Sequence, residues 1–117
     1  MARRYAAKVD ANQQDIVNAL RKAGASVQFL HGVGGGCPDI LVGFRGQNLL
    51  MEIKDGAKSP SRQRLTEWQE KWGVSWNGQA CVVSSEEEAL AVLQSPDDDQ
   101  WQSIGDIAKG MVKGAVS

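Results

Sequence analysis

Hydrophobic and polar residues alternate most clearly in the middle of the chain, between Asp39 and Lys54. Two runs there place a hydrophobic residue at every second position. These positions are Ile40, Val42, Phe44, Leu49, Met51 and Ile53. A period of two is typical of β-strands with two distinct faces. Residues 45–48 (RGQN) have the composition of a turn, so the pattern predicts a β-hairpin.

The register of this hairpin decides which side chains share a face. With a symmetric turn, Phe44 would pair with Leu49. Asp39 would then lie opposite Lys54, with Glu52 as a diagonal neighbour on the same face. A slip of a single residue would move Asp39 to the other face. The pattern therefore predicts a core on one face and, on the other, two carboxylates together with an ammonium group.

Further elements are predicted on both sides of the hairpin. They are a helix over 10–23, a strand over 26–31, a helix over 66–76, a strand over 80–84 and a helix over 86–93. Thr66 opens a capping box, and Ser85 is the expected N-cap of the last of these helices. The run 80–84 is largely apolar and suits a buried central strand. We expect Trp72 and Trp76 in the core.

Length and composition predict a single globular domain. The chain has 117 residues, of which 42% are hydrophobic. It has no apolar run of about 18 residues and no signal peptide, so we expect a soluble, cytoplasmic protein without membrane contact. Cys37 and Cys81 are far apart and accompanied by a single histidine. This argues against a zinc site and suits a reducing compartment.

Residues 96–117 differ in pattern from the domain before them. Pro96 and three aspartates predict a linker, and the hydrophobic residues beyond it recur at spacings of three and four. The resulting amphipathic helix could dock on its own domain or on a second copy of the chain, and we expect the dimer contact. The chain therefore divides into a domain over 1–95 and a C-terminal segment over 96–117.

Asp39, Glu52 and Lys54 together have the chemistry of a metal site. Two carboxylates that converge from adjacent strands suit a hard divalent cation, which takes oxygen ligands. A lysine beside them can orient an attacking water and stabilise negative charge on a phosphate. An ordinary salt bridge at a hairpin edge would use the same residue types. The shared face and the Pro-Asp and Glu-x-Lys sequences favour the metal site.

The run Pro38-Asp39, followed by Glu52-Ile53-Lys54, resembles the motif of the PD-(D/E)XK nuclease superfamily. The glycine-rich residues before it and the Leu-Thr…Gln run at 65–69 make the chain similar to the stand-alone VRR-NUC branch of phages and bacteria. The likeness covers residues 8–95. It implies a restriction-endonuclease-like three-layer α/β sandwich with a mixed central sheet. The implied order is helix, three strands, helix, strand and helix, which agrees with the elements predicted above.

The same resemblance implies a metal-dependent endodeoxyribonuclease. Family members include enzymes that act on branched DNA such as Holliday junctions, often as homodimers. Asp39, Glu52 and the backbone carbonyl of Ile53 would ligate Mg²⁺ or Mn²⁺, and Lys54 would position the attacking water. Gln69 matches a glutamine near the active site of the family and would contact nucleic acid.

Gln13 departs from the family pattern. Its helical spacing predicts that it faces the sheet, where family members usually carry a glutamate that helps to hold the metal. An amide oxygen can complete the metal site but brings no charge, so we predict weaker metal affinity. Asp10, one turn earlier, could compensate. The alternative function is a DNA-binding module that no longer cuts DNA. The alternative role for Gln13 itself is that of a hydrogen-bonding helix residue that does not contact the metal.

The charges are segregated along the chain, although the formal net charge is only −1. Lys58, Arg62 and Arg64 follow the motif, whereas acidic residues collect at 86–88 and 97–99. Such segregation can leave a basic face that contacts DNA phosphates, or it can be ordinary solvated charge. His31 and the glycines of 32–36 leave a similar choice between contact with DNA and a structural role.

Overall fold

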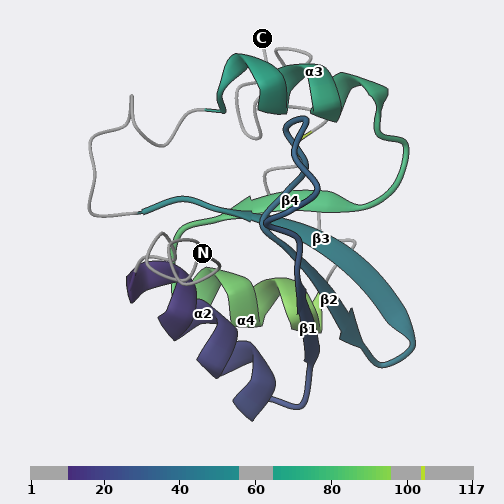
Figure 1. The fold of residues 1–117 in the computed structure, drawn as a ribbon. Coiled ribbons are helices and arrows are strands. Elements are labelled where there is room, and N and C mark those ends of the chain that lie inside the picture. Colours follow the sequence, from purple (N-terminus) through teal and green to yellow (C-terminus); the bar gives the residue numbers. More distant parts are fainter. Residues whose placement is uncertain (1–10, 56–64, 96–103, 105–117) are drawn as a thin grey trace, which may run out of the picture.

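The computed structural model describes residues 11–55, 65–95 and 104. Within these ranges a four-stranded sheet is covered by helices on both faces (Figure 1). The elements are α2 (Ala11–Lys22), β1 (Ser26–Phe29), β2 (Ile40–Phe44), β3 (Gln47–Ile53), α3 (Glu67–Ser75), β4 (Ala80–Val83) and α4 (Glu86–Gln94). Their order is the one predicted from the sequence. None of these helices is both long and apolar enough to cross a membrane.

The sheet is mixed, as predicted, and its strands lie in the order β1-β2-β3-β4. β1, β2 and β3 pair antiparallel, whereas β3 and β4 run parallel. A parallel pair needs a long crossover connection, and α3 lies within this one. Figure 1 shows α2 and α4 on one face of the sheet and α3 on the opposite face. The chain therefore has an α/β fold in which the connection through α3 joins two adjacent parallel strands, β3 and β4.

β4 lies at one end of the described sheet, so the prediction of a central strand for this run was wrong. Ala80, Cys81 and Val83 are nevertheless buried. Cys81 and Val83 belong to the core beneath α2 and α4, and Ala80 belongs to the core beneath α3. A run that is apolar on both faces shows that both faces are covered, and it does not require a neighbouring strand on each side.

The hairpin of β2 and β3 is present, but its register differs from the predicted one by two residues. Phe44 pairs with Gln47 and not with Leu49, which leaves Arg45 and Gly46 as a two-residue turn. Both turn residues have positive φ, 53° and 80°, as the tight turns of twisted hairpins require. Because the shift is an even number of residues, every side chain keeps its predicted face.

Two hydrophobic cores lie on opposite faces of the sheet. The larger one joins the apolar face of the hairpin to the helices α2 and α4, and its fully buried members include Ile16, Leu20, Ile40, Val42, Met51 and Val92. The smaller one lies beneath α3. It contains Leu50, Leu65, Ala80 and Ile104, with Leu30, Leu41, Trp72 and Val82 packed against it. The face of the hairpin that carries Glu52 is thus apolar at its centre and polar at one end.

The predicted helix caps are confirmed. Thr66 is the N-cap of α3 and forms a capping box with Gln69, and the Ser85 side chain accepts a hydrogen bond from the Glu88 amide at 3.1 Å. The prediction that Trp76 lies in the core was wrong, because this side chain is 42% exposed. The helix ends at Ser75, and Trp76, whose ring stacks on Trp72, is its C-cap with an extended backbone.

Ile104 is the part of 96–117 that the structure describes. Its side chain is 1% exposed and packs in the smaller core of its own chain. The linker, the amphipathic helix and the dimer contact predicted for the rest of this segment lie outside the described residues.

Candidate functional site

Asp39, Glu52 and Lys54 meet at the polar end of the hairpin. Asp39 directly precedes β2, Glu52 is the penultimate residue of β3, and Lys54 follows that strand. Ile40 pairs with Met51, so one further step in the same register sets Asp39 opposite Glu52. The predicted pairing of Asp39 with Lys54 was therefore wrong. The prediction that the three residues share a face was nevertheless correct, because a shift of two residues in the pairing leaves each side chain on the same face.

Short contacts fix these three residues. The Lys54 Nζ lies 3.4 Å from Oε2 of Glu52. The Asp39 Oδ2 accepts a hydrogen bond from the backbone amide of Ile53 at 2.7 Å. This bond ties the start of β2 to the end of β3 and holds the Asp39 carboxylate beside Ile53, whose carbonyl is the third predicted metal ligand.

Glu52 is buried and Asp39 is partly buried, and the two carboxyl groups act on each other. Burial raises the pKa of Glu52 to about 8, and the negative charge of Asp39 adds to the increase, whereas Lys54 opposes it. Burial also raises the pKa of Asp39, although the Ile53 amide and Glu52 oppose this shift through hydrogen bonds. Without a cation the pair therefore retains a proton at neutral pH. Binding of a divalent cation to the two carboxylates would release this proton, because ligating carboxyl groups must be deprotonated.

The stability of the metal-free protein should decrease as the pH rises from 5 to 9. The folded-state pKa of Glu52 is raised from 4.5 to about 8. The protonated form is therefore the one that favours folding, and its contribution is full below pH 4.5 and is lost as the pH rises through 8. We expect the free energy of unfolding, measured by urea denaturation in EDTA, to fall by about 2 to 4 kcal/mol.

Glu52→Gln is the control for this pH dependence, because its amide remains uncharged at every pH. Its free energy of unfolding should fall much less than that of the wild type between pH 5 and 9, because Asp39 is then the one carboxyl group left in the pair, and added Mg²⁺ should stabilise the wild type at pH 9 but not the variant. Equal slopes for the two proteins would show that other groups cause the loss.

Gln69 of α3 connects the carboxylate to the ammonium group. Its Nε2 donates to Glu52 Oε2 at 2.8 Å, and its Oε1 accepts from Lys54 Nζ at 2.9 Å. The same Oε1 also accepts the Thr66 backbone amide at 2.8 Å, which completes the capping box. Gln69 was predicted as a nucleic-acid contact, and the structure places its amide among the charged groups of the site. It therefore orients Lys54 and caps α3 with one side chain.

Gly36 allows α3 to approach the segment that leads into Asp39. Its φ is +85°, and a Cβ at this position would lie 2.2 Å from the backbone oxygen of Trp68. Gly34 and Gly35 also have positive φ, but a Cβ on either would meet no atom within 4 Å. The glycines were expected either to contact DNA or to have a structural role. At Gly36 the close contact is with the start of α3, which is a structural role.

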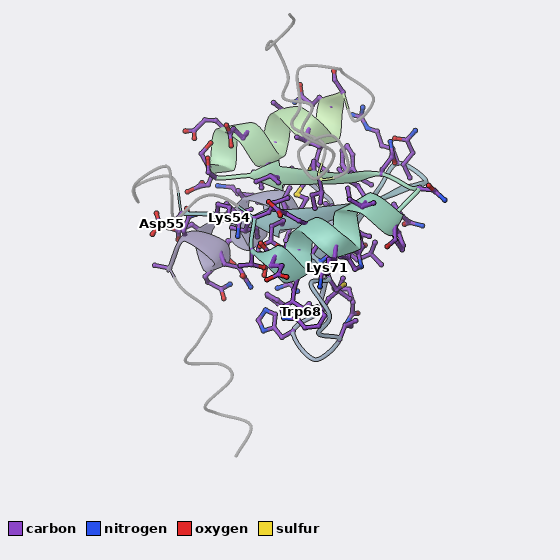
Figure 2. The ribbon with its side chains drawn as sticks, turned by 90° about the horizontal axis from the view of Figure 1, so that it is seen from above. Lys54, Asp55, Trp68 and Lys71 are labelled. Atoms are coloured by element: carbon purple, nitrogen blue, oxygen red, sulfur yellow. The ribbon has the colours of Figure 1, made fainter. Side chains whose placement is uncertain are left out.

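Helix α2 reaches the site from the other side. Gln13 is 8% exposed and faces the sheet, as its spacing predicted. Its Nε2 lies 2.9 Å from Nε2 of His31. Asn12 Nδ2 donates to the backbone carbonyl of Lys54 at 2.8 Å, and Figure 2 shows Lys54 close to this helix. Asn12 was not predicted, because a single asparagine in the first turn of a helix carries no sequence signal of its own.

The remaining predicted site residues lie outside the described part of the chain. Asp10, Lys58, Arg62 and Arg64 fall in the ranges 1–10 and 56–64. Within the described residues, no three or more His, Cys, Asp or Glu side chains gather into a metal-binding group. The donor set at the site is one buried and one partly buried carboxylate, which fits Mg²⁺, since this ion often takes only one or two carboxylates and completes its shell with water and substrate phosphate.

Comparison of the chain with protein-family models, with curated proteins and with solved structures finds no match. The fold and the site therefore define, on their own, an α/β protein with a pair of carboxylates, a lysine and a glutamine at one end of its sheet.

Proposed function

We propose that this protein is a divalent-metal-dependent endodeoxyribonuclease with a restriction-endonuclease-like sandwich. The observation that supports this most is the pairing of the buried Glu52 with the partly buried Asp39, with the Lys54 Nζ 3.4 Å from Glu52. A surface salt bridge would need neither the second carboxylate nor the burial, and it would contribute little to stability. Keeping two acids together with little access to water is unfavourable for folding, so a chemical role explains the arrangement better.

Asp39, Glu52 and the carbonyl of Ile53 would hold Mg²⁺ or Mn²⁺. When bound, the cation would supply positive charge that polarises a phosphodiester for hydrolysis. The chain's own residues prepare this chemistry. Gln69 holds the Lys54 ammonium beside Glu52, where it can bind the attacking water or a phosphate oxygen. Asn12 holds the Lys54 main chain, and so both ends of this residue are fixed.

The DNA would lie across the end of the sheet where β2 begins and β3 ends. In this proposal Lys58, Arg62 and Arg64 contact the phosphate backbone from the segment that follows Lys54. Such contacts are independent of base sequence and weaken with salt. Branched DNA such as a Holliday junction is the proposed substrate, and a homodimer would bring two sites to it.

Hydrolysis of labelled DNA tests this function directly. Four-way junction, flap and linear duplex DNA are incubated with the full chain in Mn²⁺, in Mg²⁺ and in EDTA. Cutting of the branched substrates in the presence of the metals, and none in EDTA, supports the nuclease. The second candidate is a DNA-binding module, and the uncharged Gln13 beside His31 favours it. Binding to the same DNA without cutting in either metal would support the module.

Gln13→Glu should strengthen the metal site. Gln13 is buried beside His31, and the adjacent Asn12 bonds to the Lys54 carbonyl, so a carboxylate at this position would lie near the site. The extra negative charge should lower the Mg²⁺ concentration for half-maximal cleavage by about tenfold, equivalent to about 1.4 kcal/mol. The matched control is Gln14→Glu, because Gln14 is exposed on the same helix and bonds to Asn18. An unchanged midpoint, or an equal change in both variants, would contradict a metal role for this position.

A further inference from the structure

An exposed tryptophan lies beside the proposed active site. Trp68, in the first turn of α3, is 66% exposed, which makes it the most exposed of the large hydrophobic side chains described. Trp72 on the same helix is half-buried in the smaller core, so α3 is held to the sheet without the Trp68 indole. An aromatic ring that contributes little to a core and remains in water is available for a ligand.

The backbone of Trp68 is fixed on two sides. Gly36 packs against its carbonyl group, and the adjacent residue, Gln69, bonds to Glu52 and Lys54. Successive residues of a helix point about 100° apart. Gln69 therefore points into the site while Trp68 points to the side of it. The Trp68 backbone is thus held in the helix turn that also carries Gln69, and the exposed indole extends from it beside the site.

Lys71 adds a cation to this surface. Its Nζ lies 5.3 Å from the centroid of the Trp68 ring and 3.6 Å from Oε2 of Glu67. Figure 2 shows Lys71 and Trp68 next to each other along α3. Both partners of the ion pair are largely exposed, and exposed pairs of this kind are weak. A phosphate oxygen can replace Glu67 as the partner of Lys71, which would place the attached base at the indole.

We propose that Trp68 and Lys71 form a stacking site for an unpaired DNA base next to the metal site. Bases within an uninterrupted duplex stack on one another, whereas a flap, a splayed arm or an unpaired junction base can stack on an aromatic ring. Glu67 and Glu70 place negative charge on the same helix. Stacking, not phosphate attraction, therefore dominates the affinity of this site. The selection of branched DNA rests on the proposed nuclease function, but the base-binding site does not.

Binding of single-stranded DNA in EDTA tests the stacking site without any cleavage. The probe is fluorescently labelled oligothymidine, with a labelled duplex of equal length for comparison, and the full chain is titrated by anisotropy. We expect Trp68→Leu to weaken binding of the single strand about tenfold and to leave duplex binding within twofold. Trp68→Tyr should keep most of the affinity, because it retains an aromatic face. Oligothymidine should quench the tryptophan fluorescence of the wild type more than that of Trp68→Leu.

Trp76→Leu is the matched control, because Trp76 is also exposed but lies at the far end of α3 and stacks on Trp72. It should leave binding of the single strand unchanged. Equal weakening by Trp68→Leu and Trp68→Tyr, or equal loss for the single strand and the duplex, would overturn the proposal. A fall in molecular mass of Trp68→Leu by light scattering would also overturn it, since the indole would then belong to an interface between copies.

The two proposals can fail separately. If Trp68 binds the single strand but the wild type cuts no DNA with Mn²⁺, the stacking site stands and the nuclease assignment is wrong. If the wild type cuts branched DNA, and Trp68→Leu binds the single strand and selects substrates as the wild type does, the stacking site alone is wrong.

Discussion

Asp39→Asn should abolish metal-dependent cleavage while leaving the protein folded, with a loss of about a thousandfold or more in kcat/KM. A bound metal ion contributes several kcal/mol of transition-state stabilisation, and each 1.4 kcal/mol is about tenfold in rate. The substitution removes one of two carboxylates that would hold the ion. Asparagine has nearly the same shape, and its side-chain oxygen can still accept the Ile53 amide that Asp39 accepts at 2.7 Å.

The structure indicates that this loss would not come from unfolding. The charge of Asp39 raises the pKa of Glu52. Removing it therefore relieves repulsion between the two acids, and the variant should be at least as stable as the wild type at pH 8. Single-turnover cleavage of a labelled junction at increasing Mn²⁺ measures the effect, and DNA binding in EDTA should be unchanged. Asp15→Asn, on an exposed part of α2, is the matched control. Activity of Asp39→Asn within tenfold of the wild type would contradict the proposed metal site.

Gly36→Ala should be the most damaging substitution in the glycine-rich segment, reducing both stability and cleavage. An added Cβ would lie 2.2 Å from the Trp68 oxygen, and the φ of +85° is unfavourable for any residue with a Cβ. The positive φ alone costs about 1 to 2 kcal/mol. Displacement of the backbone should add about 1 to 3 kcal/mol. Because α3 must move to relieve the contact, Gln69 should also shift away from Glu52 and Lys54.

Gly35→Ala separates the two causes. Its φ is +67°, but the added Cβ meets no atom within 4 Å. This variant should lose only the backbone contribution and keep wild-type cleavage. Gly36→Ala should cleave about a hundredfold more slowly, which is typical of a displacement of about 1 Å in an active site. Urea denaturation and cleavage assays on the two variants measure the difference. Equal losses of stability and activity in both would show that the contact with α3 is unimportant.

The hairpin illustrates what the sequence predicted and what it did not. A period of two determines which residues share a face, and this was enough to predict that Asp39, Glu52 and Lys54 gather together. The exact pairing depends on the turn, and the symmetric turn predicted over 45–48 would have paired Phe44 with Leu49. The chain uses the two-residue turn, with Arg45 at a positive φ that is uncommon for arginine. The error did not change the faces because it was an even number of residues.

The starts of α3 and α4 were predictable for a different reason. Thr66 and Ser85 act on amides three residues away, so their roles depend on local sequence alone. The second role of Gln69 depends instead on where the crossover places α3 against the sheet, and no local pattern reports that position. The same limit applies to Asn12, which contacts a carbonyl 42 residues away in the chain.

The position of β4 and the exposure of Trp76 show a further limit. An apolar run indicates that a strand is covered, but neighbouring helices can cover it as well as neighbouring strands. A tryptophan at the expected helical spacing lies in the core only while the helix continues, and α3 ends one residue earlier. The position of β4 and the exposure of Trp76 were both mispredicted because burial depends on how the sheet and helices pack together, which local sequence does not report.

The double role of Gln69 has a consequence for inactivation by heat. The same amide oxygen closes the first turn of α3 and holds the Lys54 ammonium. Fraying of that turn, which is a low-energy event at the end of a short helix, would release the lysine at the same moment. The position of Lys54 and the integrity of a single helix turn would then be one equilibrium, and the proposed nuclease activity would be lost reversibly at temperatures where the sheet is still intact.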